Sequence, residues 1–359
     1  MTAGQESDAR YVFLDYLRAS AAWLVVWDHL ANHMPEGLGQ VFAPAVYVRE
    51  HFTAPLGIIQ DFGWFGVALF FLISGFIISD RARVEGVFEF AVRRILRIYP
   101  MLAVAVLLSA AFVIPKDQVS AEKILLNLTL VNYVMVPQVA LVGVAWTLVV
   151  EMVFYALTAL TQFARESPHR IGLNLIVAAL VIWKISAFGP QFSLFGVAMS
   201  YVPILTMGQT IYWWLAKGRL SVAWGLAYLL AAYGVFVWGL TKIQPTFLAA
   251  SNSYLVSVAY ALLLFLVLMR ARLPERRFIR LLSDTSYSMY LIHGIVGWLV
   301  LVGLVSRTPL AVAILLATLA SLAASLLTYR LVELPTQRLG RRLTRGRRLA
   351  LSPPVEGGT

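Results

Sequence analysis

The chain has 359 residues, of which 60% are hydrophobic and 13% are charged, and its mean hydropathy is +0.78. This composition excludes an ordinary soluble domain and predicts an all-α, polytopic membrane helix bundle. The chain contains no cysteine, which excludes disulfides, thiolate metal sites and a cysteine nucleophile, and we expect no metal.

Runs of about 17–25 apolar residues predict about ten transmembrane helices. They lie near residues 11–33, 61–80, 96–114, 142–163, 171–188, 192–215, 221–240, 251–270, 285–305 and 308–332. The first run is long, carries charges and has no small-residue cleavage site after it, so we expect a spanning helix there and not a signal peptide. The segment 122–136 is too short to span and is expected to be re-entrant or interfacial.

The net charge is +11, and the positions of the basic residues along the chain predict how the protein is oriented in the membrane. With the N-terminus in the cytoplasm, most of the 29 Lys and Arg residues lie in cytoplasmic segments, and the external segments hold only Arg49, Lys116, Lys123, Lys242 and Arg307. This bias predicts that both termini lie in the cytoplasm. We expect the protein to reside in the cell inner (plasma) membrane. Orientation and anionic lipid headgroups then explain the basic charge, and no nucleic-acid partner is expected. We expect one transmembrane domain over residues 1–336 and a basic, partly disordered cytoplasmic tail over residues 337–359.

The first predicted helix carries Asp15, Arg18, Asp28 and His29. Ionisable groups inside a span are costly and point to a functional site. On an α-helix, Arg18 and His29 share one face about 16 Å apart along the axis, and Asp15 falls on nearly the same stripe. A salt-bridged structural helix is the alternative. Asp28 is offset from His29 by about 100° and is expected to face another helix.

The next two stretches suggest close helix packing and an anion site. Small residues in the second span favour close approach of helices, and Ser74 beside Gly75 could admit a ligand. In the cytoplasmic segment that follows, Arg94 and Arg97 share a helix face, with Arg93 to one side. Converging guanidiniums suit a phosphate-bearing ligand, because the planar fork binds phosphate oxygens bidentately. Anchoring to acidic lipid is an equally good explanation.

Two later spans offer polar side chains. Glu151 in the fourth span lies at a depth similar to that of His29, so a carboxylate could orient the imidazole and stabilise its protonated form. A simple hydrogen bond between helices is the alternative. In the ninth span, Tyr287 and Tyr290 lie on one stripe, and with His293 they could line a tunnel that faces the cytoplasm. We assign no catalytic role to spans five to eight.

Taken together, these stretches resemble the acyltransferase 3 family of membrane enzymes, which acylate sugars on polysaccharides, lipid-linked glycans, antibiotics and related acceptors. The resemblance covers essentially the whole chain and is carried, in the family's order, by LDYLRASAAWLVVWDH, FFLISGF, FAVRRILRIYP, WTLVVEMVFY, TSYSMYLIH and YRLVELP. It implies a ten-span core, acyl-CoA as the cytoplasmic donor, His29 as the catalytic residue, and a role for Arg18, Arg94 and Arg97 in holding the donor. Asp28 directly before His29 departs from the family pattern.

The sequence therefore predicts an O-acyltransferase that moves an acyl group, acetyl in the simplest case, from acyl-CoA to a hydroxyl of a sugar, glycan or glycosylated metabolite. His29 is the predicted base, with Glu151 as its partner. The predicted donor site contains Arg18, Arg93, Arg94, Arg97, Ser74, Tyr287 and Tyr290, and the predicted acceptor site contains Asp15, Asp28 and Trp146. The alternative is a secondary transporter or flippase that uses Asp15, Arg18, His29 and Glu151 as a proton or substrate site.

Overall fold

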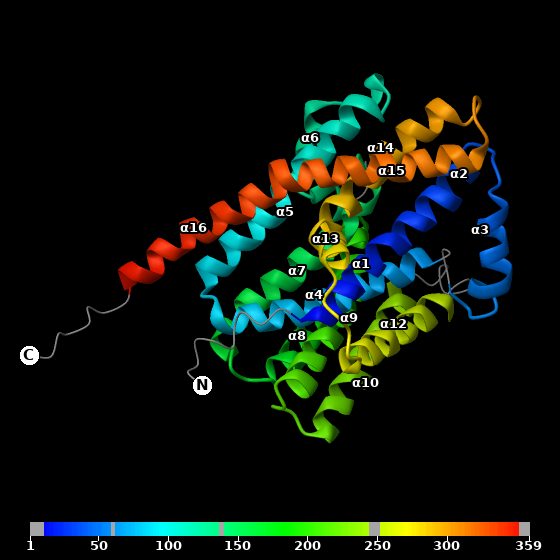
Figure 1. Cartoon of the computed structure of the whole chain (residues 1–359). Coiled ribbons are helices and arrows are strands. Elements are labelled where there is room, and N and C mark those ends of the chain that lie inside the picture. Colours follow the sequence, from blue (N-terminus) through cyan, green and yellow to red (C-terminus); the bar gives the residue numbers. More distant parts are fainter. Residues whose placement is uncertain (1–10, 59–61, 136–139, 244–251, 352–359) are drawn as a thin grey trace, which may run out of the picture.

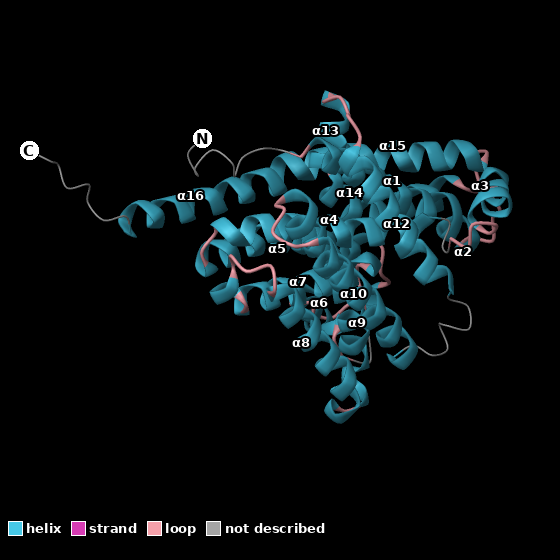
Figure 2. Cartoon of the chain, turned by 90° about the horizontal axis from the view of Figure 1, so that it is seen from below, coloured by secondary structure: helices cyan, strands magenta, loops and turns pink. Residues whose placement is uncertain are grey.

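The computed structural model describes residues 11–58, 62–135, 140–243 and 252–351 (Figure 1). These residues form helices and connecting loops, and none of them lies in a strand (Figure 2). The structure thus confirms the predicted all-α, polytopic helix bundle.

Each of the ten predicted spans corresponds to a helix. These helices are α1 (Val12–Trp27), α4 (Gly63–Val84), α5 (Val87–Phe112), α7 (Trp146–Leu160), α8 (Arg170–Lys184), α9 (Ser193–Ile211), α10 (Val222–Ile243), α12 (Asn252–Arg270), α14 (Ser286–Leu304) and α15 (Leu310–Thr328). Within the described ranges, eight helical segments are long and apolar enough to cross a membrane. The two that fall short are α1, which has 16 residues and carries charges, and α8, which has 15 residues.

Further helices connect or extend the spans. They are α2 (Met34–Gly37), α3 (Ala43–Val48), α6 (Ala121–Leu128), α13 (Arg277–Asp284) and α16 (Leu334–Leu351). Through a π-helical turn at Tyr329–Glu333, α15 continues into α16, which packs along α5 and projects beyond the bundle (Figure 1). The predicted tail is therefore helical as far as Leu351. Its predicted disordered end, residues 352–359, lies outside the described residues.

The centre of the bundle is α4, which packs against α1, α9 and α12. Small residues allow this close packing, as the sequence predicts. A side chain at Gly66 would meet the backbone of Ala21 in α1, and a side chain at Gly75 would meet the backbone of Leu205 in α9. Because α1 and α4 both line the cavities described below, this packing fixes the positions of the functional side chains.

Substitution of Gly208 tests the contact between α4 and α9. A Cβ added at Gly208 would fall on the backbone carbonyl of Leu72, and two helix backbones have no flexible atom that could move aside. We expect Gly208→Ala to destabilise the protein by about 1–3 kcal/mol, the usual cost of overpacking, seen as a lower thermal midpoint in detergent. Gly234→Ala is the matched control, because nothing lies within 4 Å of a Cβ there. An unchanged midpoint for Gly208→Ala would contradict the packing.

Candidate active site

The functional end of the first helix is not a regular α-helix. Helix α1 ends at Trp27, and the chain continues as a π-helix over Asp28–His33. Such segments are frequent at functional sites, and their wider turn brings residues five apart to one side. Nδ1 of His33 accordingly lies 3.1 Å from Oδ1 of Asp28. The assumption of a continuous α-helix therefore fails from Asp28 onward.

His29 lines a large cavity of about 790 Å³ between the helices. We call this space the histidine cavity, and its polar and aromatic lining consists of Asp28, His29, His33, Trp64, Ser109, Tyr133, Trp146, Tyr201, Tyr254, Tyr290 and His293. Two predicted acceptor residues, Asp28 and Trp146, thus lie in the same cavity as His29. Their role in binding an acceptor stays a prediction.

The nearest partner of His29 is a second histidine. Nδ1 of His29 lies 2.9 Å from Nε2 of His293, which is fully buried on α14. Nδ1 of His293 lies 2.9 Å from the backbone carbonyl oxygen of Met289. The two imidazoles therefore form a hydrogen-bonded chain that ends at the backbone.

Aromatic rings form one wall of the histidine cavity. Trp64 and Trp146 are stacked with their ring centroids 6.2 Å apart, and the Tyr201 ring lies 5.0 Å from Trp64 and 5.3 Å from Trp146. Opposite the π-helix, Gly63 leaves the space that the Asp28 carboxylate fills. Apolar faces and a buried carboxylate therefore border the same space, which suits a ligand with both apolar and hydroxyl surfaces.

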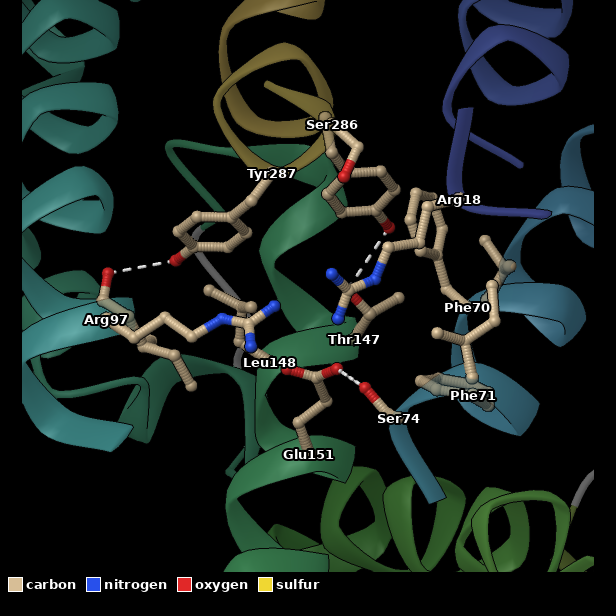
Figure 3. A pocket seen from close by; sticks show the side chains of 14 residues that line it. Arg18, Phe70, Phe71, Ser74, Arg97, Thr147, Leu148, Glu151, Ser286 and Tyr287 are labelled. Atoms are coloured by element: carbon tan, nitrogen blue, oxygen red, sulfur yellow. Dashed lines mark hydrogen bonds between the residues drawn. The ribbon is translucent and has the colours of Figure 1, made fainter. Parts of the chain in front are cut away.

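A second, smaller pocket contains most of the predicted donor residues. We call it the arginine pocket, and its lining includes Arg18, Phe70, Ser74, Arg97, Thr147, Glu151, Ser286, Tyr287 and Tyr290. The side chains of Arg18 and Arg97 approach its centre from two sides, above Glu151 (Figure 3). Arg97 lies near Glu151 and Glu333 but makes no ion pair or hydrogen bond with any residue in the described part of the chain. The pocket therefore offers positive charge to a ligand.

Glu151 lies in the arginine pocket and does not contact His29, so the predicted pairing of these two residues is wrong. Its carboxylate accepts hydrogen bonds from the hydroxyl of Ser74 and from that of Tyr155, the latter at 3.2 Å. Glu151 and His29 lie at similar predicted depths in the bilayer, but depth does not specify which side of α7 a residue occupies. In the structure that side faces α4 and α5.

The structure does not bring Arg93 and Arg94 into either cavity. Arg93 forms ion pairs with Glu85 at 2.9 Å and Glu89 at 2.5 Å, and Arg94 lies 3.3 Å from Glu85. The Arg94 guanidinium also lies against the ring of Tyr155, 6.0 Å from its centroid. Arginine pairs readily with carboxylates, and two buried glutamates next to these residues in the sequence provide them.

Asp15 also lies apart from both cavities. It is buried, and its carboxylate accepts a hydrogen bond of 2.8 Å from the hydroxyl of Ser283. Although it shares a stripe of α1 with Arg18, it lies one turn nearer the start of the helix, against α13. The structure thus gives Asp15 a contact between helices and does not place it with the other predicted acceptor residues.

The arginine pocket and the histidine cavity meet at two shared lining residues, Val67 and Tyr290. The hydroxyl of Tyr290 donates to the carbonyl oxygen of Val144 at 3.2 Å and accepts from the hydroxyl of Thr147 at 3.1 Å. These bonds fix the tyrosine between the two spaces. Tyr290 and Val67 therefore stand at the boundary between the two spaces.

Comparison with known proteins agrees with this arrangement. The sequence model of a family described as an acyltransferase domain matches residues 11–330, which include both cavities. The chain belongs to this acyltransferase family. It is 28% identical over 376 residues to Nodulation protein 10 of Rhizobium leguminosarum bv. viciae, with 94% of this chain and 96% of that protein covered. No solved structure matches the chain. The protein is therefore a multi-pass membrane acyltransferase.

Sequence reasoning missed several residues that line the histidine cavity of the acyltransferase. His293 was expected only in a tunnel facing the cytoplasm, yet it pairs with His29. Tyr133 comes from the segment 122–136, where Asn127 accepts a hydrogen bond of 2.9 Å from the backbone of Leu141 and so folds the segment over the cavity. The signal available was a second histidine inside a span, which by itself indicates a functional site.

The polar groups that line the two cavities include side-chain hydroxyls, imidazoles, guanidiniums and carboxylates. Among the described residues, no group of three or more His, Asp or Glu side chains is arranged to hold a metal ion.

Proposed function

We propose that this acyltransferase moves an acyl group, acetyl in the simplest case, from acyl-CoA to a hydroxyl of a sugar, glycan or glycosylated metabolite. The observation that carries the proposal is the junction at Tyr290 between a pocket with two arginines and a cavity with His29. A donor with a polyanionic end and a neutral thioester end requires two such spaces in contact. We place the protein in the cell inner membrane with both termini in the cytoplasm.

Arg18 and Arg97 bind the anionic part of the donor. Guanidiniums form strong, charge-assisted hydrogen bonds with phosphate, and these bonds gain strength where water is excluded. Glu151, held by Ser74 and Tyr155, balances part of this charge before the donor arrives. Arg18 lies in α1 and His29 lies at the start of the π-helix that follows Trp27, so about 14 Å of α-helix separates Arg18 from that π-helix, a span that a pantetheine arm can bridge. Keeping the phosphates at this end avoids moving a polyanion across the membrane.

His29 acts as the base. It takes the proton of the acceptor hydroxyl while that oxygen forms a bond with the thioester carbonyl carbon. The carbon–sulfur bond then breaks, and the leaving CoA thiolate takes the proton from His29. Each turnover thus forms one ester and one free thiol, and His29 returns to its neutral state.

The aromatic wall and Asp28 receive the acceptor. Sugar rings have apolar faces, which pack against aromatic rings such as Trp64 and Trp146, and hydroxyl edges, which need polar partners. Tyr133 and Asp28 offer such partners at the border of the same cavity. Membrane lipid surrounds the bundle, so a lipid-linked glycan has access to the protein as well as a free glycoside.

The test is an assay of purified protein with acetyl-CoA and longer acyl-CoAs, with and without glycoside acceptors. We expect release of free thiol that depends on the acceptor, together with a product heavier by the mass of one acyl group. Vesicle flux of a substrate without release of thiol would instead support a transporter or flippase and would contradict the proposal.

A further inference from the structure

One hydrogen bond determines which nitrogen of His293 carries the proton in its neutral ring. Nδ1 of His293 lies 2.9 Å from the carbonyl oxygen of Met289. A carbonyl oxygen can only accept, so Nδ1 of His293 must be the nitrogen that donates. The ring is fully buried, where a charged group is costly to hold. In the neutral ring, Nε2 of His293 therefore carries a lone pair and can only accept.

The same reasoning extends to His29. Its Nδ1 lies 2.9 Å from Nε2 of His293. Because that nitrogen accepts, Nδ1 of His29 must donate, and the proton of the neutral ring is held there. Nε2 of His29 is then the unprotonated nitrogen of a ring that lines the histidine cavity. The backbone carbonyl of Met289 thus specifies the tautomer of His29 through His293.

We propose that His293 is a positioning residue, which keeps Nε2 of His29 available as the base. The proposal rests on the function given above, in which His29 takes the acceptor proton. Without the second imidazole, the His29 ring keeps only its backbone hydrogen bond to Val25, so its proton is no longer directed to Nδ1 by His293, and the tautomer protonated at Nε2 cannot accept a proton at the cavity side. When His29 does accept the proton, its Nδ1–H bond to His293 also stabilises the imidazolium that forms.

The first part of the test compares two substitutions of one residue. His293→Leu introduces a side chain of similar reach that has no acceptor, so we expect kcat to fall about 10–100-fold, the range found for residues that orient a metal-bound imidazole, with KM for acyl-CoA unchanged. His293→Gln places an amide oxygen near the position of Nε2, and we expect its kcat to be close to that of the wild-type protein. His169→Leu is the matched control, because His169 is exposed at the start of α8 and bonded to Tyr228.

The second part observes the tautomer directly. The chain has only five histidines, so ¹⁵N-histidine spectra in a neutral bilayer mimic are tractable, and loss of a signal in His29→Ala assigns His29. We expect wild-type His29 to be protonated at Nδ1 and bare at Nε2, and we expect His293→Leu to shift the proton toward Nε2. A wild-type His29 protonated at Nε2, or full kcat in His293→Leu, would overturn the proposal.

The two parts separate this inference from the proposed function. If His29→Ala retains wild-type turnover, the function of His29 as base is wrong, while the wild-type spectrum still decides the tautomer. If His29→Ala is inactive and His293→Leu is fully active, only the role of His293 is wrong. If His293→Leu does not fold, the wild-type spectrum still decides which nitrogen of His29 carries the proton, and a full kcat with an unshifted tautomer in His293→Ala would overturn the role of His293.

Discussion

His29→Ala is expected to reduce acyl transfer by about 10²–10⁴-fold, the usual contribution of a general base. The reason is structural: His29 lines a cavity that adjoins the arginine pocket at Tyr290. The measurement is kcat from thiol release with a saturating glycoside acceptor. KM for acyl-CoA should change little, because the phosphates bind elsewhere.

The control for this prediction is His51→Ala. His51 is exposed in the π-helix Arg49–Thr53, where its ring stacks on Tyr47 and lines neither cavity. We expect His51→Ala to retain wild-type kcat. Equal turnover of His29→Ala and the wild-type protein, at equal amounts of folded protein, would show that His29 is not the base.

Arg97→Ala is expected to raise KM for acyl-CoA by about 10–100-fold. Loss of a hydrogen bond to a charged group usually costs about 1.5–3 kcal/mol, and each 1.4 kcal/mol corresponds to a factor of ten. Arg97 has no ion pair with a described residue, so its charge is available to the ligand. Arg97→Lys should have an intermediate effect, because lysine keeps the charge but not the planar fork.

Arg94→Ala is the matched control, since it removes the same side chain one helical turn away. Arg94 is paired with Glu85, so we expect KM to change by less than about threefold and the thermal midpoint to fall instead, because a buried carboxylate loses one of its partners. If Arg94→Ala raised KM as much as Arg97→Ala did, the donor site would have to include both arginines, as the family resemblance implies.

Most of the fold could be predicted from the sequence, because the bilayer imposes a local rule. A spanning segment must satisfy its backbone polar groups internally and present apolar side chains to lipid, so hydropathy alone locates it. Every predicted span has a helix in the structure. The π-helix at Asp28–His33 was not predictable in this way, because its register depends on contacts with other helices.

The site could be predicted only in part. The structure collects six of the site residues predicted from the sequence in one pocket: Arg18, Ser74, Arg97, Glu151, Tyr287 and Tyr290. The predicted hydrogen bond between Glu151 and His29 is wrong. Glu151 instead bonds to Ser74 and Tyr155, and His29 bonds to His293. Axial position along a helix can be read from the sequence, but rotation against a neighbouring helix cannot.

The sequence by itself determined that this protein is a membrane helix bundle, that ionisable groups lie inside its spans, and that it resembles acyltransferases. These properties follow from residue type and spacing along single helices. Only the tertiary structure decided that the arginines and His29 occupy two adjoining spaces, and that a histidine 264 residues further along the chain bonds to His29. Such pairings depend on which helices pack together, and that is decided by the fit of side chains across the whole bundle.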